Sequence, residues 1–475
     1  MNEEQRSAIR DAAKYLRQVR PLDPAELSEY VEDRPHPAAV AQELRESAVE
    51  LGLRECSDGT FEPAPEGSVS LNIGRITGLP ESAQRVLEDR LVDAYGPGWA
   101  SGQAGDDLRR RIRDLKSRYL HGTPVEYDER TALAYAVYHL PQSYATAAYV
   151  LADLAADDLV PAQCRVLDVG AGVGGPALAV AEHLAPQGVV DYTALEPSPA
   201  AGFLETLLDA TDPNFHLSVT RETVEAYDPT GDFDLILFSN VLSELDDPQG
   251  TVGRMLDSLT PTGTVVAIAP ADRNTATALR EIEREVEASH GATIYAPTVR
   301  LWPGLAPEST SWSFDVKPDL EVPAPQRRLD GGERTRSVDG EQPGDGTFEN
   351  VDVRFAFSYL RLADERRHEF TPDSRRFARM RDADDHVTDR IDCVAIKLSH
   401  DLSSGKDANP LFLIGDGSQL IDHFAVRTAA STLNEDLLAA SYGDMLVIEN
   451  ALVLWNDDEA AYNLVVDAET LVSRA

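Results

Sequence analysis

Two short segments carry the residues best suited to chemistry. Gly170, Gly172 and Gly174 follow an apolar run that contains one acid, Asp168. Glycine accepts a positive φ and has no Cβ, so the backbone of such a turn can approach a ligand closely. A second apolar run ends on Glu196, and an acid at the end of a strand can accept both hydroxyls of a ribose. Together these residues predict a site for a nucleoside cofactor.

Two cofactors match this pattern. Gly170, Gly172 and Gly175 also satisfy the G-x-G-x-x-G spacing of dinucleotide folds. Asp168 favours S-adenosylmethionine over NAD, because an acid just before the turn can receive an ammonium, which only S-adenosylmethionine has. A glycine turn without a ligand is the third alternative. The order of acid and glycines resembles the first motif of class I methyltransferases. It predicts these cofactor-binding residues: Asp168, Gly170, Ala171, Gly172, Gly174 and Glu196.

A doubly wound parallel sheet would bring these residues together. Apolar runs at 232–240 and 264–269, the second after a turn at 261–263, are typical of buried strands. Helical patterns at 199–208 and 274–289 alternate with them, which predicts an α/β, Rossmann-like fold. Ligands of such folds bind at the carboxyl ends of the strands, so Gly170, Glu196 and Asn240 should share one rim.

The flanking segments predict further domains. Residues 1–65 read as two helices and a hairpin, typical of a winged helix, and 66–160 as a helical lead-in. The Rossmann-like methyltransferase domain spans 161–365, with an inserted loop region at about 300–350, where 334–346 is rich in charge and glycine. Residues 385–475 show three strands, a helix and two strands, the order of an OB-like β domain. Its aromatic residues, Phe412, Phe424, Trp455 and Tyr462, are expected in the core.

Composition limits the classes of protein. The 475 residues carry a net charge of −39, from 82 acids and 43 bases, and only five bases are lysine. An acidic, lysine-poor surface resembles the proteins of salt-accumulating archaea, although ordinary acidic proteins are the alternative. No apolar stretch is long enough for a membrane span, and the N-terminus lacks signal-peptide character. We therefore expect a cytoplasmic protein that is a monomer when free. Three scattered cysteines predict neither disulfides nor a metal site.

Two stretches concentrate arginine. Residues 107–118 hold six bases and two acids, and 361–381 hold seven arginines and four acids. Such clusters in an acidic chain are candidates for phosphate contact. The equal alternative for each is a solvated face paired with nearby acids. In the first stretch the RNA-binding candidates are Arg109, Arg110, Arg111 and Arg113.

Several segments resemble a known family, the methyltransferase-like assembly factors of the small ribosomal subunit (the ribosomal small subunit protein twenty-two family). They are 117–119, 132–136 and 140–145, then 239–245, 312–314 with 325–327, and 357–360, with a fainter likeness at 442–444. The resemblance implies S-adenosylmethionine binding and association with small-subunit 16S-type ribosomal RNA. It also implies an iron–sulfur cluster near 300–320. Since no cysteine lies between Cys164 and Cys393, we expect no cluster, and we expect Trp302, Trp312 and Phe314 to order that region instead.

The sequence identifies the residues that would transfer a methyl group less clearly than those that would bind the cofactor. After the fourth strand, base-nitrogen methyltransferases usually carry Asn/Asp-Pro-Pro-aromatic, whereas this chain has Ser-Asn-Val-Leu at 239–242. Asn240 is the one catalytic candidate, and a cap on the next helix is the favoured alternative for it. Three functions stay open: an RNA methyltransferase, an inactive RNA-binding assembly factor that uses the cofactor site structurally, and a small-molecule methyltransferase.

Overall fold

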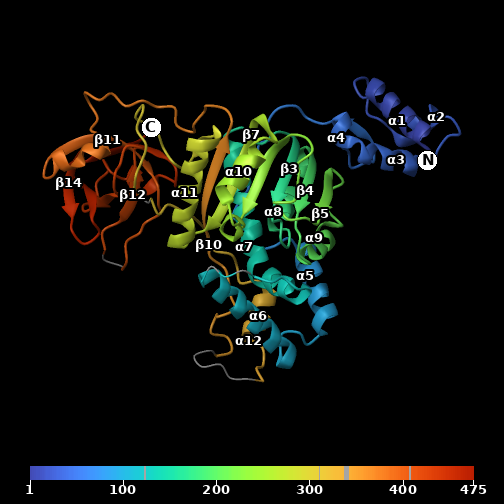
Figure 1. Cartoon of the computed structure of the whole chain (residues 1–475), viewed down its shortest axis with the longest axis horizontal. Helices are drawn as coiled ribbons and strands as arrows, with labels where there is room; N and C mark the ends of the chain where they lie inside the picture. The colour runs from blue at the N-terminus through green and yellow to red at the C-terminus, as the bar shows by residue number, and fades with distance from the viewer. Residues whose placement is uncertain (122, 124, 310, 336–341, 406–407) are drawn as a thin grey trace. The chain divides into compact units, whose positions relative to one another are not determined.

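The chain folds as two compact units (Figure 1). The computed structural model describes residues 1–475 except 122, 124, 310, 336–341 and 406–407. The first unit comprises Met1–Glu244, Ser258–Gly263 and Pro318–Val353, and the second comprises Leu245–Asp257, Thr264–Lys317 and Arg354–Ala475. Within the described residues, no helix has both the length and the apolar character that crossing a membrane requires.

The N-terminal part of the first unit has the hairpin and the helical segments predicted there, together with a first helix, α1, that the sequence analysis missed. Its elements are α1 (Glu3–Leu16), α2 (Pro24–Glu29), α3 (Pro37–Glu46), α4 (Ala48–Leu51), β1 (Leu53–Glu55) and β2 (Phe61–Pro63). Asp23 caps α2 by accepting a hydrogen bond from the Ala25 N–H, which relieves one unpaired helical donor. Phe61 is fully buried and its backbone bridges to Leu22, so the hairpin and the helices share one core.

Three long helices follow: α5 (Glu81–Tyr95), α6 (Gly102–His121) and α7 (Glu129–Ala156). Pro141 lies inside α7 and has no N–H to offer the Val137 carbonyl one turn before it. The side-chain amide of Gln326, in α12 (Ala324–Gly331), donates to that carbonyl at 2.9 Å and to the Tyr138 carbonyl at 3.2 Å. The sequence analysis singled out the segments 140–145 and 325–327. In the structure they meet and complete the backbone hydrogen bonds of α7.

The central sheet confirms the predicted fold class. Its strands are β3 (Gln163–Val169), β4 (Val189–Leu195), β5 (Phe215–Thr220), β6 (Phe233–Ser239), β7 (Leu259–Pro270), β8 (Thr293–Ala296), β9 (Asp315–Lys317) and β10 (Val353–Arg361). Hydrogen bonding orders them β5-β4-β3-β6-β7-β10-β8, with β9 on β10. The pairs among β3 to β6 are parallel, whereas β10 is antiparallel to β7 and β8. Numbered along the chain, this is order 3-2-1-4-5-7-6 with strand seven reversed, that of class I methyltransferases.

Helices and turns complete this region: α8 (Gly175–His183), η1 (Ala185–Gln187), α9 (Ala200–Leu208), η2 (Leu242–Glu244), α10 (Pro248–Leu256) and α11 (Arg273–His290). In Figure 1, α8 and α9 run beside β3, β4 and β5. Two predictions were wrong in detail. The expected turn at 261–263 lies inside β7, and the region predicted as an inserted loop contains α12. Of the predicted loop at 334–346, residues 336–341 lie outside the described part of the chain.

The C-terminal segment of the second unit forms the predicted OB-like barrel. After η3 (Met380–His386) come β11 (Arg390–Lys397), β12 (Leu411–Gly415), β13 (His423–Arg427), α13 (Asp436–Ala439), β14 (Met445–Asn456), β15 (Ala461–Val466) and β16 (Leu471–Arg474). The sheet runs β11-β12-β13-β15-β14 and closes because β11 also pairs with β14, while β16 extends it beside β14. Figure 1 shows these strands in orange to red.

The aromatic residues of the barrel are divided between core and surface. Phe412 is buried among the barrel's apolar residues, as predicted. Trp455, in contrast, is 41% exposed, so its predicted place in the core was wrong. Its ring meets Tyr462 edge-on at 5.0 Å on the neighbouring strand, and its indole N–H donates to Asp457. Trp455 lies near the end of β14, where few strand neighbours remain to cover it.

Candidate functional site

The glycine turn is built as the sequence predicts. Gly170, Gly172 and Gly174 all have positive φ, at 70°, 54° and 88°, between the end of β3 and the start of α8. The N–H groups of Gly170 and Ala171 both donate to the Leu195 carbonyl at the end of β4. A Cβ on Gly170 would lie 2.6 Å from the Val241 side chain, so this position has no room for one.

Gly172 faces open space. A Cβ there would have no neighbour closer than the Gly170 carbonyl oxygen at 3.9 Å. The Gly172 N–H donates to one carboxylate oxygen of Glu196 at 2.8 Å, and the Ser198 N–H donates to the other at 2.8 Å. Glu196 is only 7% exposed, so these two bonds fix a nearly buried carboxylate. Each oxygen keeps a lone pair that can accept from a hydroxyl.

Asp168 lies beneath the turn and is fully buried. Its Oδ2 accepts a hydrogen bond from the Tyr192 hydroxyl at 2.7 Å, across the neighbouring strand β4. Its Oδ1 is buried and has no hydrogen-bond partner among the described residues. Burial, reinforced by the negative charge of Glu196 and opposed by the Tyr192 hydroxyl, raises the pKa of Asp168 to about 7. The sequence analysis missed Tyr192, which no local pattern connects with Asp168.

Asn240 lies where β6 ends, on the same rim as the glycine turn. Its φ is +59°, an uncommon value for a residue other than glycine. Asp247, not Asn240, caps α10 by accepting from the Gly250 N–H at 2.9 Å. The favoured alternative for Asn240, a cap on the next helix, was therefore wrong. In the described part of the chain, its side-chain amide has no hydrogen-bond partner.

The arginine stretch of α6 is largely an internal network. Arg109 is 1% exposed, and its guanidinium donates to the carbonyls of Ala100 and Leu329 and to the Asp106 carboxylate. The expectation that Arg109 belongs to an exposed basic surface was therefore wrong. Its burial follows from the partner carbonyl in α12, more than two hundred residues away in sequence.

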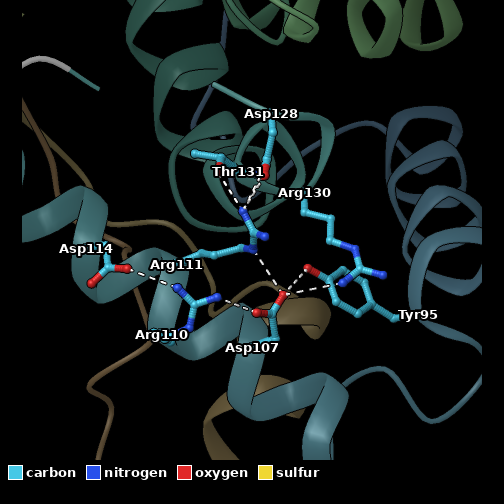
Figure 2. A network of polar contacts seen from close by, with 8 residues as sticks. All are labelled: Tyr95, Asp107, Arg110, Arg111, Asp114, Asp128, Arg130 and Thr131. Atoms are coloured by element: carbon cyan, nitrogen blue, oxygen red, sulfur yellow. Dashed lines mark hydrogen bonds and ion pairs between the residues drawn. The ribbon is translucent and has the colours of Figure 1, made fainter. Parts of the chain in front are cut away.

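Asp107 holds the neighbouring arginines (Figure 2). Arg110 donates to Asp107 at 2.5 Å and to Asp114 at 3.3 Å, and Arg111 donates to Asp107 at 3.0 Å and to Asp128 at 2.8 Å. Arg113 packs its guanidinium over the Phe348 ring at 5.7 Å. These contacts match the alternative of a face paired with acids. RNA contact by Arg110, Arg111 and Arg113 stays a prediction.

A second arginine-rich surface lies in the second unit. An open groove of about 870 Å³ is lined by residues 374–379 together with Asp382, His386 and residues 389–392. Arg376 pairs with Glu449, and Arg379 pairs with Asp382 at 2.7 Å. The Arg375 side chain is exposed and has no partner among the described residues. Of the arginines described in this groove, Arg375 has no acidic partner, whereas Arg376 and Arg379 are each paired with an acid.

Packing orders the segment around residue 300. The Trp302 indole N–H donates to Asp416 at 2.7 Å, and the Trp312 indole N–H donates to the Ala271 carbonyl at 3.0 Å. Phe314 is buried and contacts the Trp312 ring at 5.5 Å between centroids. Asp416 also accepts from the Met380 N–H, so one buried carboxylate connects three segments of the second unit.

Comparisons with known proteins agree on the central region. Residues 108–321 match a family model described as a methyltransferase domain. Residues 6–57 and 381–475 match the N-terminal and C-terminal models of one domain of unknown function (DUF8157). No curated protein matches this sequence.

Several solved structures with some similarity are described as methyltransferases. The mitomycin 7-O-methyltransferase MmcR is 17% identical over 62% of this chain and 90% of its own, with a TM-score of 0.27. The plantazolicin methyltransferase BpumL, in complex with SAH, is 10% identical over 59% and 100%, with a TM-score of 0.28. Magnesium protoporphyrin IX methyltransferase (ChlM) from Synechocystis, with bound SAM, is 14% identical over 46% and 88%, at 0.27. TM-scores this low define no shared fold, so the fold rests on strand order and the domain match.

Proposed function

We propose that this protein binds S-adenosylmethionine at the glycine turn and is a methyltransferase-type protein. The observation that carries the proposal is Glu196, a nearly buried carboxylate that the Gly172 N–H holds at 2.8 Å beside open space. A fixed carboxylate at this rim suits the two hydroxyls of a ribose. The same position in the fold binds nucleotide cofactors in doubly wound sheets generally.

Other residues fit the amino-acid end of the cofactor. The unpaired Oδ1 of Asp168 is a buried acceptor without a partner in the described chain, and an ammonium group would supply one. No described side chain caps the N-terminus of α8, so the N–H groups of its first turn, apart from Pro176, suit a carboxylate. When bound, the cofactor supplies an electrophilic methyl group on its sulfonium. The chain itself binds and orients that group at the rim where Asn240 lies.

Calorimetric titration with S-adenosylmethionine tests this assignment. Asp168→Ala and Glu196→Ala should each weaken binding by about tenfold or more, since each removes a carboxyl group that would accept hydrogen bonds from the ligand. Glu225→Ala changes an exposed acid outside the glycine turn and serves as the matched control. Unchanged affinity in both site variants would refute the assignment.

We further propose that the partner is small-subunit ribosomal RNA during ribosome assembly. Two observations support it: the motif segments that resemble the assembly-factor family, and the arginine-lined groove with its uncommitted Arg375. Neutralising phosphates with arginine is the main source of affinity for RNA. Arg375→Ser with Arg379→Ser should reduce co-sedimentation with small ribosomal subunits, whereas Arg221→Ser, an exposed arginine paired with Glu205, should not. Equal co-sedimentation of all three proteins would contradict the proposal.

A second candidate is an assembly factor that binds the cofactor without transferring methyl groups. The sequence Ser-Asn-Val-Leu at 239–242, which lacks the Pro-Pro-aromatic of base-nitrogen methyltransferases, favours it. Incubation of immature small subunits with methyl-labelled cofactor separates the two candidates. Label in the RNA supports transfer. Label that survives Asn240→Ala shows that Asn240 does not take part.

A further inference from the structure

Three of the segments that the sequence analysis singled out meet beside the sheet edge that carries the glycine turn. Tyr119 ends 117–119, Tyr135 lies in 132–136 and Glu244 lies in 239–245. These residues come from α6, α7 and η2, and Tyr127 joins them from the segment before α7. We call Tyr119, Tyr127, Tyr135 and Glu244 the tyrosine–glutamate cluster. The cofactor site already described uses none of them.

The cluster is a connected set of rings with a carboxylate. The hydroxyls of Tyr119 and Tyr127 lie 2.5 Å apart, and the rings of Tyr127 and Tyr135 are 6.0 Å apart at 67°. The Tyr135 ring also contacts His139, one helical turn further along α7, at 4.7 Å. The Tyr119 hydroxyl is close enough to the Glu244 carboxyl to lower its pKa. Aromatic faces and a carboxylate are therefore presented together.

The cluster adjoins the carboxylate assigned to the ribose. The negative charges of both Glu244 and Glu196 reach the phenols of Tyr127 and Tyr135 and, together with burial, raise the pKa of each. Burial of the carboxyl group, opposed by the Tyr119 hydroxyl and reinforced by the charge of Glu196, raises the pKa of Glu244. Val241 lies against Gly170, and its carbonyl accepts from the Glu244 N–H at 2.8 Å, so a group bound at Glu244 would lie next to a cofactor at the glycine turn.

The cluster is also accessible. Tyr119 is 36% exposed, Tyr127 and Tyr135 are half-buried, and the Glu244 side chain as a whole is exposed despite its contacts. Carboxylates are among the charges that act on Glu244 and on the phenols of Tyr127 and Tyr135. A carboxylate beside accessible ring faces favours a flat ring that donates N–H groups.

We propose that the tyrosine–glutamate cluster is the acceptor site and binds an unstacked nucleobase with an exocyclic amino group, cytosine or adenine. This inference rests on the proposed function. Tyrosine faces stack a base irrespective of sequence, as in other sites for single-stranded RNA. Glu244 supplies selectivity, because a carboxylate accepts from an amino group but has no donor for the carbonyl that uracil presents at the same place.

The geometry also assigns Glu244 a role in transfer. The lone pair of the amino nitrogen forms the new N–C bond as the S–C bond of the methyl donor breaks. The sulfur leaves as a neutral thioether with the bonding pair. The nitrogen, now positively charged, releases one proton to the Glu244 carboxylate. A carboxyl with a raised pKa is better matched to receive that proton at neutral pH.

Fluorescence anisotropy with labelled single-stranded hexamers of C, A and U tests the site, using the full chain saturated with S-adenosylhomocysteine. We expect the C and A hexamers to bind about five-fold more tightly than U, a difference within the range of one base contact. Glu244→Gln should reduce that preference below about twofold, because glutamine offers a donor as well as an acceptor. Tyr135→Leu should weaken all three about tenfold through lost stacking.

The matched control is Glu225→Gln, which should leave all affinities unchanged. Equal binding of the three hexamers by the unmodified protein overturns the inference. So does a preference that persists in Glu244→Gln, or binding of a lysine-containing peptide in place of any oligonucleotide. Calorimetry with S-adenosylhomocysteine on the same proteins distinguishes failure of the proposed function from failure of the acceptor site. If the unmodified protein does not bind the cofactor, the proposed function is refuted. If it binds the cofactor but shows no base preference, only the acceptor site is refuted.

Discussion

The glycine turn and the arginine stretch of α6 were both singled out by short sequence patterns, yet the structure uses them differently. At the turn, positive φ at Gly170 and Gly172 and the bond from the Gly172 N–H to Glu196 follow from residues within one β-α-β unit. In α6, Arg109 is buried against a carbonyl of α12, and Arg111 reaches Asp128 at the start of α7. The turn lies within that one unit, whereas the burial of Arg109 depends on a partner 220 residues away. Arg110 and Arg111 pair with acids much closer in sequence (Figure 2).

This difference explains why one pattern predicts function better than the other. A glycine turn has few alternatives, because only glycine adopts three positive φ values without strain. An arginine can bind phosphate, pair with an acid or cap buried carbonyls, and its sequence neighbours do not decide among these. Four predictions test the contrast, from the largest expected effect to the smallest.

The largest effect should come from Asp168 at the base of the turn. Its pKa is raised from 3.8 to about 7, so between these values the folded state holds a proton that the unfolded state has released. Stability contributed by this group is therefore lost as pH rises from 4 to 7. Asp168→Asn lacks this loss, and its stability relative to the unmodified protein should rise by up to about 4 kcal/mol across that range.

Denaturant unfolding at a series of pH values measures this difference. Asp209→Asn, which changes an acid outside the glycine turn, is the control and should show no such trend. A constant difference between Asp168→Asn and the unmodified protein would mean that Asp168 is charged throughout, and the local account of the turn would fail.

The second effect concerns Arg109. Arg109→Met should lower the free energy of unfolding by about 3 kcal/mol, because it leaves buried carbonyls and the Asp106 carboxylate without their cation. Guanidinium denaturation with far-UV circular dichroism measures the loss. A loss below about 1 kcal/mol would place Arg109 on the surface, as the sequence alone predicted.

The third effect concerns Glu196, which belongs to the turn. Glu196→Gln should weaken S-adenosylmethionine binding by about thirtyfold, or about 2 kcal/mol, since a charged acceptor of hydrogen bonds becomes neutral. Calorimetry gives the affinity, with Glu225→Gln as control. An effect on unfolding as large as that on binding would show that the carboxylate serves the fold rather than the ligand.

The smallest effect should be at Arg110. Its ion pairs with Asp107 and Asp114 are exposed, so Arg110→Ser should change the free energy of unfolding by less than about 0.5 kcal/mol. The same denaturation experiment checks it beside Arg109→Met. Because Arg110 is a remaining RNA-contact candidate, its variant can be compared in co-sedimentation without a loss of folding. If Arg110→Ser and Arg109→Met lowered the free energy of unfolding equally, Arg109 and Arg110 could not be distinguished as a buried and a surface arginine.

Most of the regular structure was predictable from the sequence. The order of strands and helix in the barrel was expected element by element, since alternating apolar residues and turn residues mark each strand. The strands β5, β8, β9 and β16 and the helices α1 and α12 were missed. They are short or contain few apolar residues, so no periodicity distinguishes them from loops.

The candidate site was predictable only in part. Glycines and the acids at strand ends are contiguous signals, and the structure places Gly172 and Glu196 in contact. Tyr192, which bonds Asp168, and the tyrosine–glutamate cluster have no such signal, because their members come from different elements. The free Asn240 amide likewise depends on Asp247 having taken the cap of α10.

The sequence by itself determined the fold class, the glycine turn and the barrel order, because backbone conformation and strand patterning depend on neighbouring residues. Tertiary structure alone decided which charges are buried, which acids pair with which arginines and which tyrosines gather beside the rim. Those outcomes depend on desolvation and on partners hundreds of residues apart, such as Arg109 with the Leu329 carbonyl. Residue type predicts that a polar group needs a partner, but only the folded chain determines which one it finds.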